Sequence, residues 1–247
     1  MGRPPARRVW LAPGFILHQY AYRDTSRIVE VFTAEHGRLT LFARGANGPK
    51  SSLKGILRPF QRLLLSWSGK SEACQLVTAE VDGQVTTLPA QRLMSGFYLN
   101  ELLLKLTERC DPHPEIFFSY AECMQSLCGG DAVEACLRRF EKRLLNDLGY
   151  GLDLAQTAQG QPVQTDRYYR FALESGAQPC VAEAPGAVYG QSLADLQAES
   201  FSDARSLRDA KRLLRAAIDT CLDGRTLKSR EVMLALRQLE PAPTPAP

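Results

Sequence analysis

The sequence predicts an α+β protein, in which a small five-stranded β-barrel precedes an α-helical domain that carries an irregular insert. Three observations support this fold class. Residues 13–82 alternate between apolar and polar positions over short runs, as half-buried strands do. After Pro89 the apolar residues recur with a helical period. Lys and Arg outnumber Asp and Glu by 12 to 5 in residues 1–80, whereas residues 81–247 hold 18 against 22.

Five segments of the first third have the composition of strands. The first begins at Phe15, and the others cover residues 28–32, 38–44, 60–67 and 74–81. Residues 28–32 are rich in β-branched side chains, and the next segment places Leu39, Leu41 and Ala43 on one face. Five short strands with a loop between the third and the fourth fit a closed barrel of the oligonucleotide-binding (OB) type.

The remaining two thirds of the chain show helical periodicity with one interruption. Helices are predicted over residues 93–106, 116–127, 134–148, 207–222 and 228–239. Residues 150–200 are weakly patterned, with a strand-like piece at residues 168–173. We therefore expect a barrel domain at residues 1–82 and a helical domain at residues 83–240 with its insert at about residues 150–200. The Pro-rich residues 241–247 can form neither helix nor central strand and are expected to be disordered.

Composition excludes several classes of protein. No window reaches the roughly 18 apolar residues of a membrane span, and no secretory apolar core follows the basic N-terminus. A cytoplasmic protein without membrane association is therefore expected. The seven cysteines are odd in number and include no CxxC pair, which speaks against a complete disulfide framework or a four-cysteine zinc site. We expect neither a metal nor any other cofactor.

The sequence contains no pattern of an enzyme site. Its three histidines form no HExxH motif, and GxSxG is absent. The segment from Gly45 to Ser51 approaches a phosphate-binding loop, but Pro49 removes a backbone donor and the glycines are three positions apart. A nuclease would need clustered carboxylates for metal, which the sequence does not show. No catalytic residue is therefore predicted.

The charge asymmetry indicates that the barrel contacts a polyanion, with a solvated basic face as the alternative. Aromatic side chains lie among the basic strands, and Phe32 and Trp67 are assigned to the core. Phe42 shares its face with Arg38 and Arg44, which makes it a candidate for stacking on a base. The candidate DNA-binding residues are Arg38, Phe42, Arg44, Lys50, Lys54 and Arg58.

A second candidate site lies on the helix around residues 137–144. Four cations accompany an apolar stripe there, inside an otherwise acidic half of the chain, and Arg138 and Lys142 share a face. An apolar groove with a cationic rim suits a peptide that carries carboxylates and an aromatic anchor. We assign Leu137, Arg138 and Lys142 to this site, with the solvated face of a packed helix as the alternative.

Several motifs in order along the chain resemble one family. They run through Phe32-Thr33, His36 to Thr40, Ala43 to Gly45, Lys50 to Gly55, Leu57 to Phe60, Tyr98 to Leu102, Leu137 to Glu141, Leu144-Leu145, Leu148 to Gly151 and Leu227 to Glu231. Together they resemble the RecO family of bacterial recombination mediators, from about Ala12 to Leu239.

This resemblance implies a DNA-repair protein of the bacterial nucleoid that works without catalytic turnover. Members bind single- and double-stranded DNA, anneal complementary strands, engage single-stranded DNA-binding protein, and with RecR help RecA to load. Arg138 would then pair with a carboxylate of the acidic C-terminal tail of single-stranded DNA-binding protein. An RNA-binding module built on the same OB barrel, without mediator activity, is the alternative.

The chain departs from the family in the insert. Many members carry a four-cysteine zinc module after the Leu-Gly-Tyr-Gly segment. Here Ala155-Gln156-Thr157 stands where the first cysteines would be, and Cys180 is the only cysteine of the insert. We therefore expect a degenerate module that holds no zinc.

Overall fold

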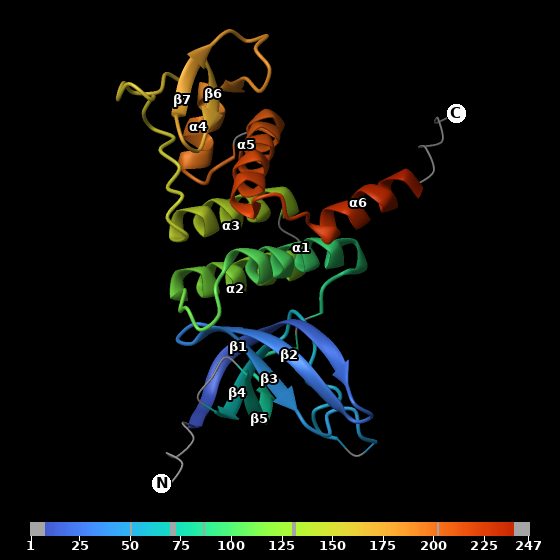
Figure 1. The fold of residues 1–247 in the computed structure, drawn as a ribbon. Coiled ribbons are helices and arrows are strands. Elements are labelled where there is room, and N and C mark those ends of the chain that lie inside the picture. The colour runs from blue at the N-terminus through green and yellow to red at the C-terminus, as the bar shows by residue number, and fades with distance from the viewer. Residues whose placement is uncertain are drawn as a thin grey trace, which may run out of the picture.

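The structure is a computed structural model. It describes residues 8–49, 51–69, 73–85, 87–129, 132–201 and 203–239. Lys50 and the Pro-rich segment 241–247 lie outside the described residues. The predicted α+β fold class is confirmed, with an N-terminal closed barrel followed by helices (Figure 1). No helix of the described chain is both long and apolar enough to cross a membrane.

The barrel closes in the strand order β1-β2-β3-β5-β4. Its strands are β1 Arg8–Tyr22, β2 Ser26–Thr33, β3 Gly37–Ala43, β4 Arg62–Ser68 and β5 Ala73–Val81. The pair β3–β5 is parallel, and the other neighbours are antiparallel. Strand β1 is longer than the sequence predicted, because register shifts after Val9 and Ile16 let one strand pair with both β2 and β4.

The alternation read from the sequence fills the barrel. Leu39, Leu41 and Ala43 are buried, as predicted, and Trp67 joins the same core. Phe32 is also fully buried, but its ring packs with Phe117 of the helical domain at a centroid distance of 6.0 Å. One side of β2 therefore serves as a floor for the helices rather than as barrel interior.

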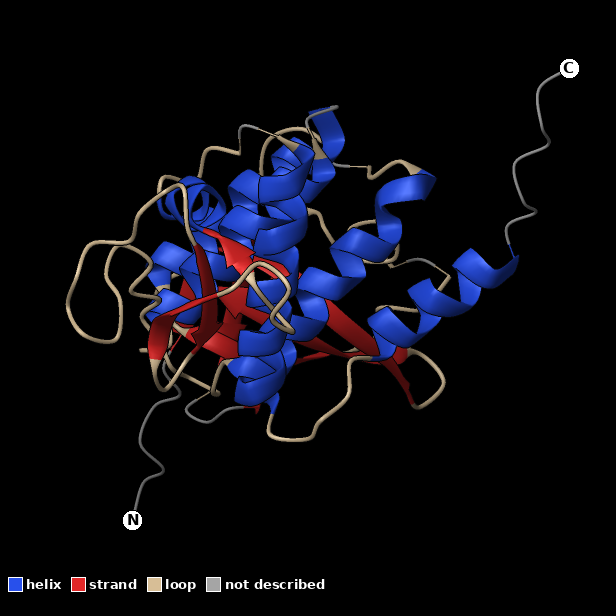
Figure 2. Cartoon of the chain, turned by 90° about the horizontal axis from the view of Figure 1, so that it is seen from above, coloured by secondary structure: helices blue, strands red, loops and turns tan. Residues whose placement is uncertain are grey.

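Six helices follow the barrel. They are α1 Ala90–Leu106, α2 Pro114–Gly129, α3 Val133–Asp147, α4 Gly190–Gln197, α5 Ala204–Leu222 and α6 Lys228–Leu239. Helices α1 and α2 lie between the barrel and the other helices (Figure 1). Seen from above, the helices cover the barrel strands, and α6 runs outward from the body (Figure 2).

The insert is more regular than the sequence predicted. It forms a three-stranded sheet in the order β7-β6-β8, from β6 Tyr168–Ala172, β7 Gly176–Cys180 and β8 Val188–Tyr189. Tyr169 and Val188 are buried in the helical core, so apolar packing ties the sheet to the domain. Within the described residues, no three His, Cys, Asp or Glu side chains are grouped to hold a metal ion. The absence of zinc stays a prediction.

Barrel and helices meet through polar contacts as well as aromatic ones. Asn100 of α1 donates to the carbonyl of Leu17 at 2.8 Å and accepts from the Tyr120 hydroxyl at 2.5 Å. Gly37, with a φ of 61°, lies so close to the Asp111 carbonyl that a Cβ would overlap it. The loop between α1 and α2 therefore lies directly against the start of β3.

Candidate nucleic-acid and peptide-binding surfaces

The exposed cations of the barrel gather after β3. Arg44 follows the last residue of β3, and Lys54 and Arg58 lie in the connection to β4; all three side chains are exposed. The predicted residue Lys50 belongs to the same connection but lies outside the described residues. A cation on an open loop can meet a phosphate oxygen without first losing a partner in the protein.

The structure places Arg38 elsewhere than the sequence suggested. Its side chain is only 12% exposed and forms an ion pair with Glu30 at 3.6 Å. Its Nη2 donates to the carbonyl of Thr107 at the end of α1, at 2.8 Å. Arg109 pairs with the same Glu30 at 3.0 Å. Because the α1–α2 loop covers the start of β3, Arg38 joins barrel to helices instead of lying on the open face with Arg44.

Phe42 is half-buried on the outer face of the barrel, beside tyrosines that the sequence prediction did not select. Tyr22 meets it edge-on, with ring centroids 5.9 Å apart. The strand registers pair Tyr20 with Ile28 and Ile28 with Phe42, so the two rings flank one aliphatic side chain. Tyr20 is 52% exposed, and the Arg23 guanidinium lies over the Tyr22 ring. The missed signal was the alternation of Tyr20 and Tyr22 along β1.

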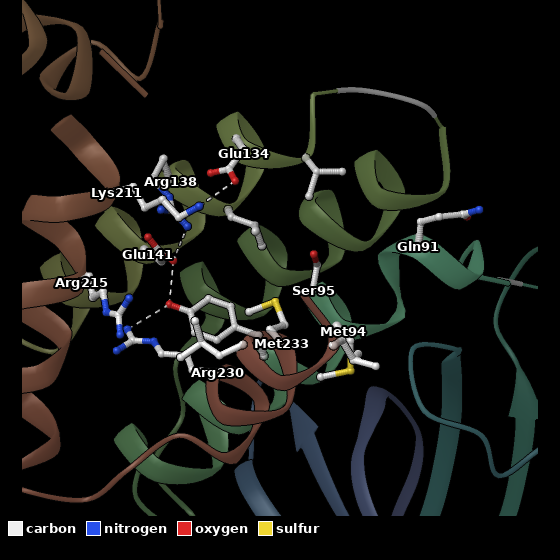
Figure 3. A pocket seen from close by; sticks show the side chains of 15 residues that line it. Gln91, Met94, Ser95, Glu134, Arg138, Glu141, Lys211, Arg215, Arg230 and Met233 are labelled. Carbon is white, nitrogen blue, oxygen red and sulfur yellow. Dashed lines mark hydrogen bonds and ion pairs between the residues drawn. The ribbon is translucent and has the colours of Figure 1, made fainter. Parts of the chain in front are cut away.

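A groove of about 320 Å³ opens between α1, α3, α5 and α6 (Figure 3). The predicted residues Leu137 and Arg138 line it, together with apolar side chains of α1 and α6. Arg138, Lys211, Arg215 and Arg230 gather at one end, whereas Met94 and Met233 lie toward the other (Figure 3). The groove therefore has a cationic end and an apolar end.

Arg138 is part of a buried network at the floor of this groove. It is 4% exposed, and its Nη2 donates to Glu141 Oε1 at 2.7 Å. The hydroxyl of Tyr98 donates to the same oxygen at 2.7 Å. Burial raises the pKa of Glu141, and the charge of Arg138 opposes that rise. Burial and the nearby Glu141 carboxylate also raise the pKa of Tyr98.

Lys142 does not line the groove. One helical turn beyond Arg138, its ammonium donates to the Gln197 carbonyl at 2.8 Å and to the Glu199 carboxylate at 3.3 Å. The chain that leaves α4 covers this turn of α3, so the face shared by Arg138 and Lys142 is divided between two surroundings. The structure brings Leu137 and Arg138 together in the groove and leaves Lys142 outside it.

Three cations of the groove were not predicted. Lys211 and Arg215 are one turn apart on α5, and their side chains are 42% and 55% exposed. Arg230 of α6 is 15% exposed and pairs with Asp219 while its Nη2 lies 3.5 Å from the Tyr98 hydroxyl. The i, i+4 spacing of Lys211 and Arg215 was visible in the sequence, but only folding shows that α5 faces α3.

Comparison with known proteins gives one family for both halves of the chain. A family model described as "Recombination protein O N terminal" matches residues 8–82, and one described as "Recombination protein O C terminal" matches residues 90–231. The DNA repair protein RecO of Azoarcus sp. (strain BH72) is 43% identical over 94% of this chain and 98% of its own length. That of Aromatoleum aromaticum is 42% identical over 94% of this chain and 98% of its own length.

Proposed function

Because the chain belongs to the RecO family of DNA repair proteins, we propose that it is a recombination mediator that binds DNA and the tail of a DNA-coating protein. It binds single- and double-stranded DNA, anneals complementary strands, and engages single-stranded DNA-binding protein. With RecR it promotes the loading of RecA. It performs these steps by binding, without catalytic turnover.

DNA lies on the barrel. The exposed Arg44, Lys54 and Arg58 meet phosphates, and such contacts add affinity with little preference for sequence. The half-buried Phe42 and the more exposed Tyr20 offer rings on the same outer face. Stacking of a base on such a ring contributes about 1–3 kcal/mol in single-strand binders. Arg38 supports this surface from behind, through its ties to Glu30 and Thr107.

The groove of the helical domain holds the acidic tail of single-stranded DNA-binding protein. The observation that carries this proposal is the division of the groove into a cationic and an apolar end (Figure 3). Carboxylates of the tail pair with Arg215 and Lys211, which are exposed enough to turn toward a ligand. An aromatic side chain of the tail packs against Met94 and Met233, since thioethers adapt to ring edges.

Arg138 acts in this groove from its floor. Its Nε is buried and has no hydrogen-bond partner among the described residues, while its Nη2 is held by Glu141. A carboxylate at the cationic end satisfies that remaining donor. The network with Glu141 and Tyr98 fixes the guanidinium before the tail arrives, which lowers the entropic cost of binding.

Annealing follows from these two surfaces. Cations on the barrel reduce the repulsion between two phosphate backbones. Capture of the coating protein by its tail raises the local concentration of the strand that it covers. The alternative, an RNA-binding OB module without mediator activity, would need the barrel cations but no groove with a cationic and an apolar end.

The test compares two variants by fluorescence anisotropy with a labelled tail peptide and a labelled oligonucleotide. Arg215→Ala removes an exposed cation of the groove, and Lys228→Ala removes an exposed cation at the start of α6 that does not line it. Arg215→Ala should weaken the peptide about fivefold, which corresponds to about 1 kcal/mol for a solvated ion pair. Lys228→Ala should not.

Annealing of strands coated with the cognate protein, without nucleotide or metal, provides the second readout. Arg215→Ala should slow the annealing of coated strands more than that of bare strands. A peptide that binds wild type and Arg215→Ala equally would remove the tail from this groove. Failure of the wild type to anneal coated strands would favour the RNA-binding alternative.

A further inference from the structure

A second concentration of cations lies at the other end of α5, beyond the groove. A hollow of about 470 Å³ is lined there by Tyr168, Arg205, Arg208 and Arg212, with one carboxylate, Asp209. It is bounded by α5, by β6 and by the loop that leads to β8. In Figure 1 this region lies at the opposite end of the molecule from the barrel.

The single carboxylate of the lining is already engaged. Asp209 is 13% exposed and accepts hydrogen bonds from the Ser192 hydroxyl at 2.9 Å and the Tyr189 backbone nitrogen at 3.3 Å. It also pairs with Arg212 at 3.1 Å. Three guanidinium groups around one buried acid leave the hollow with an excess of positive charge. An anion from solution is therefore favoured there.

Two of the arginines are held in place by the insert sheet. The Arg205 guanidinium lies 4.1 Å from the centroid of the Tyr189 ring and donates to the Tyr168 hydroxyl at 2.8 Å. Arg212 donates to the Ala187 carbonyl. Both remain 40–50% exposed, so they are oriented without being covered. Fixed cations at an open surface lose less side-chain freedom when they bind an anion.

The sheet adds a cation of its own. On β6 the buried Tyr169 separates Tyr168 from the exposed Arg170, so these two side chains point to the same outer face. Arg208 is exposed on α5 between Arg205 and Arg212. The name α5–sheet surface is used below for Arg170, Arg205, Arg208 and Arg212.

The spacing along α5 suits a phosphate chain better than a single anion. Arg205, Arg208 and Arg212 are at positions i, i+3 and i+7 and therefore share a face over about 10 Å of helix. Adjacent phosphates of one duplex strand are about 3.4 Å apart along the axis, so this face spans several of them. Lys211 and Arg215 continue the row of cations from the hollow into the tail groove.

We propose that the α5–sheet surface is a second nucleic-acid site, which binds the backbone of single-stranded DNA separately from the barrel. This inference rests on the proposed function, because the tail groove adjoins the surface along the same helix. A coating protein held by its tail in the groove releases its strand beside α5, where the surface takes it up. The barrel holds the complementary strand.

The test uses charge reversal at the two exposed members that have no role in packing the sheet. Arg170→Glu/Arg208→Glu changes the surface, and Lys228→Glu is the control, since it reverses an exposed cation outside the hollow and the groove. The salt dependence of binding to a single-stranded oligonucleotide is measured for each. The double variant should lower the slope of log affinity against log salt by about two, one per lost contact. Lys228→Glu should leave the slope unchanged.

A barrel variant, Lys54→Glu/Arg58→Glu, separates the two sites. It should retain weak single-strand binding that disappears when Arg170→Glu/Arg208→Glu is added. The tail peptide should bind the surface variant as it binds wild type, while annealing of coated strands slows. An unchanged slope, an equal loss in Lys228→Glu, or a loss confined to duplex DNA would overturn the second site and leave the proposed function intact. A wild type that binds no single-stranded DNA would instead overturn the proposed function.

Discussion

The barrel and the helical groove both present cations, but they hold them in different ways. Arg44, Lys54 and Arg58 lie on exposed loops around β3 and β4. In the groove, Arg138 is almost fully buried and already paired with Glu141, whereas Arg215 is open to solvent. A substitution on the barrel therefore changes binding alone, whereas one on the groove floor changes the fold first. This difference decides which variants report on function.

The largest effect that this comparison predicts is at Arg138. Arg138→Ala leaves the Glu141 carboxylate buried and without its ion pair. Breaking a buried pair by removal of one partner costs about 3–5 kcal/mol of the free energy of unfolding. Urea denaturation should show this loss at neutral pH, and weaker peptide binding by this variant would follow from unfolding as well as from lost contact.

The matched control replaces both partners. Arg138→Met/Glu141→Leu removes the charges together and should recover most of the lost stability, since apolar pairs of similar size replace buried ion pairs well. It should still bind the tail peptide more weakly than wild type, because a fixed guanidinium is gone. A folded double variant with undiminished peptide affinity would exclude Arg138 from the site.

The second prediction concerns the one barrel cation that the structure moves out of the candidate DNA surface. Arg38→Ala removes the hydrogen bond to Thr107 and one of two arginine partners of Glu30, and Arg109 remains as the other. The expected cost is about 1–3 kcal/mol of stability, with little change in DNA affinity. Thermal unfolding and oligonucleotide anisotropy measure the two quantities. Lost DNA affinity at unchanged stability would return Arg38 to the DNA surface.

The sequence was sufficient for much of the fold because local patterns dictate it. The inward positions Leu39, Leu41 and Ala43 follow from an alternation of period two, and that alternation is satisfied within one barrel. The helix periods located α1, α2, α3, α5 and α6 for the same reason. The insert escaped because its short strands are stabilised by packing on α5 rather than by their own pattern.

The candidate sites were harder to predict because exposure depends on contacts far along the chain. Arg38 and Arg44 share a face of β3, yet residues 107–111 cover only the first of them. Arg138 and Lys142 share a face of α3, yet the segment after α4 covers Lys142. Periodicity gives the face of a strand or helix, and it cannot say which distant segment lies upon that face.

The smallest effect expected from a single lost contact is in the salt dependence of the barrel. Lys50→Ala/Lys54→Ala removes two cations of the β3–β4 connection, of which Lys54 is exposed and Lys50 lies outside the described residues. Each phosphate contact releases about one condensed counterion, so the slope of log affinity against log salt should flatten by up to about one unit per contact. Stability should stay constant, since neither change creates a buried unpaired charge. Titration of a labelled oligonucleotide from low to physiological salt measures the slope, and urea denaturation measures the stability. A slope that stays at the wild-type value would move the DNA from this connection to the face around Tyr20 and Phe42, and the contrast between open barrel cations and buried groove cations would then no longer separate binding from folding.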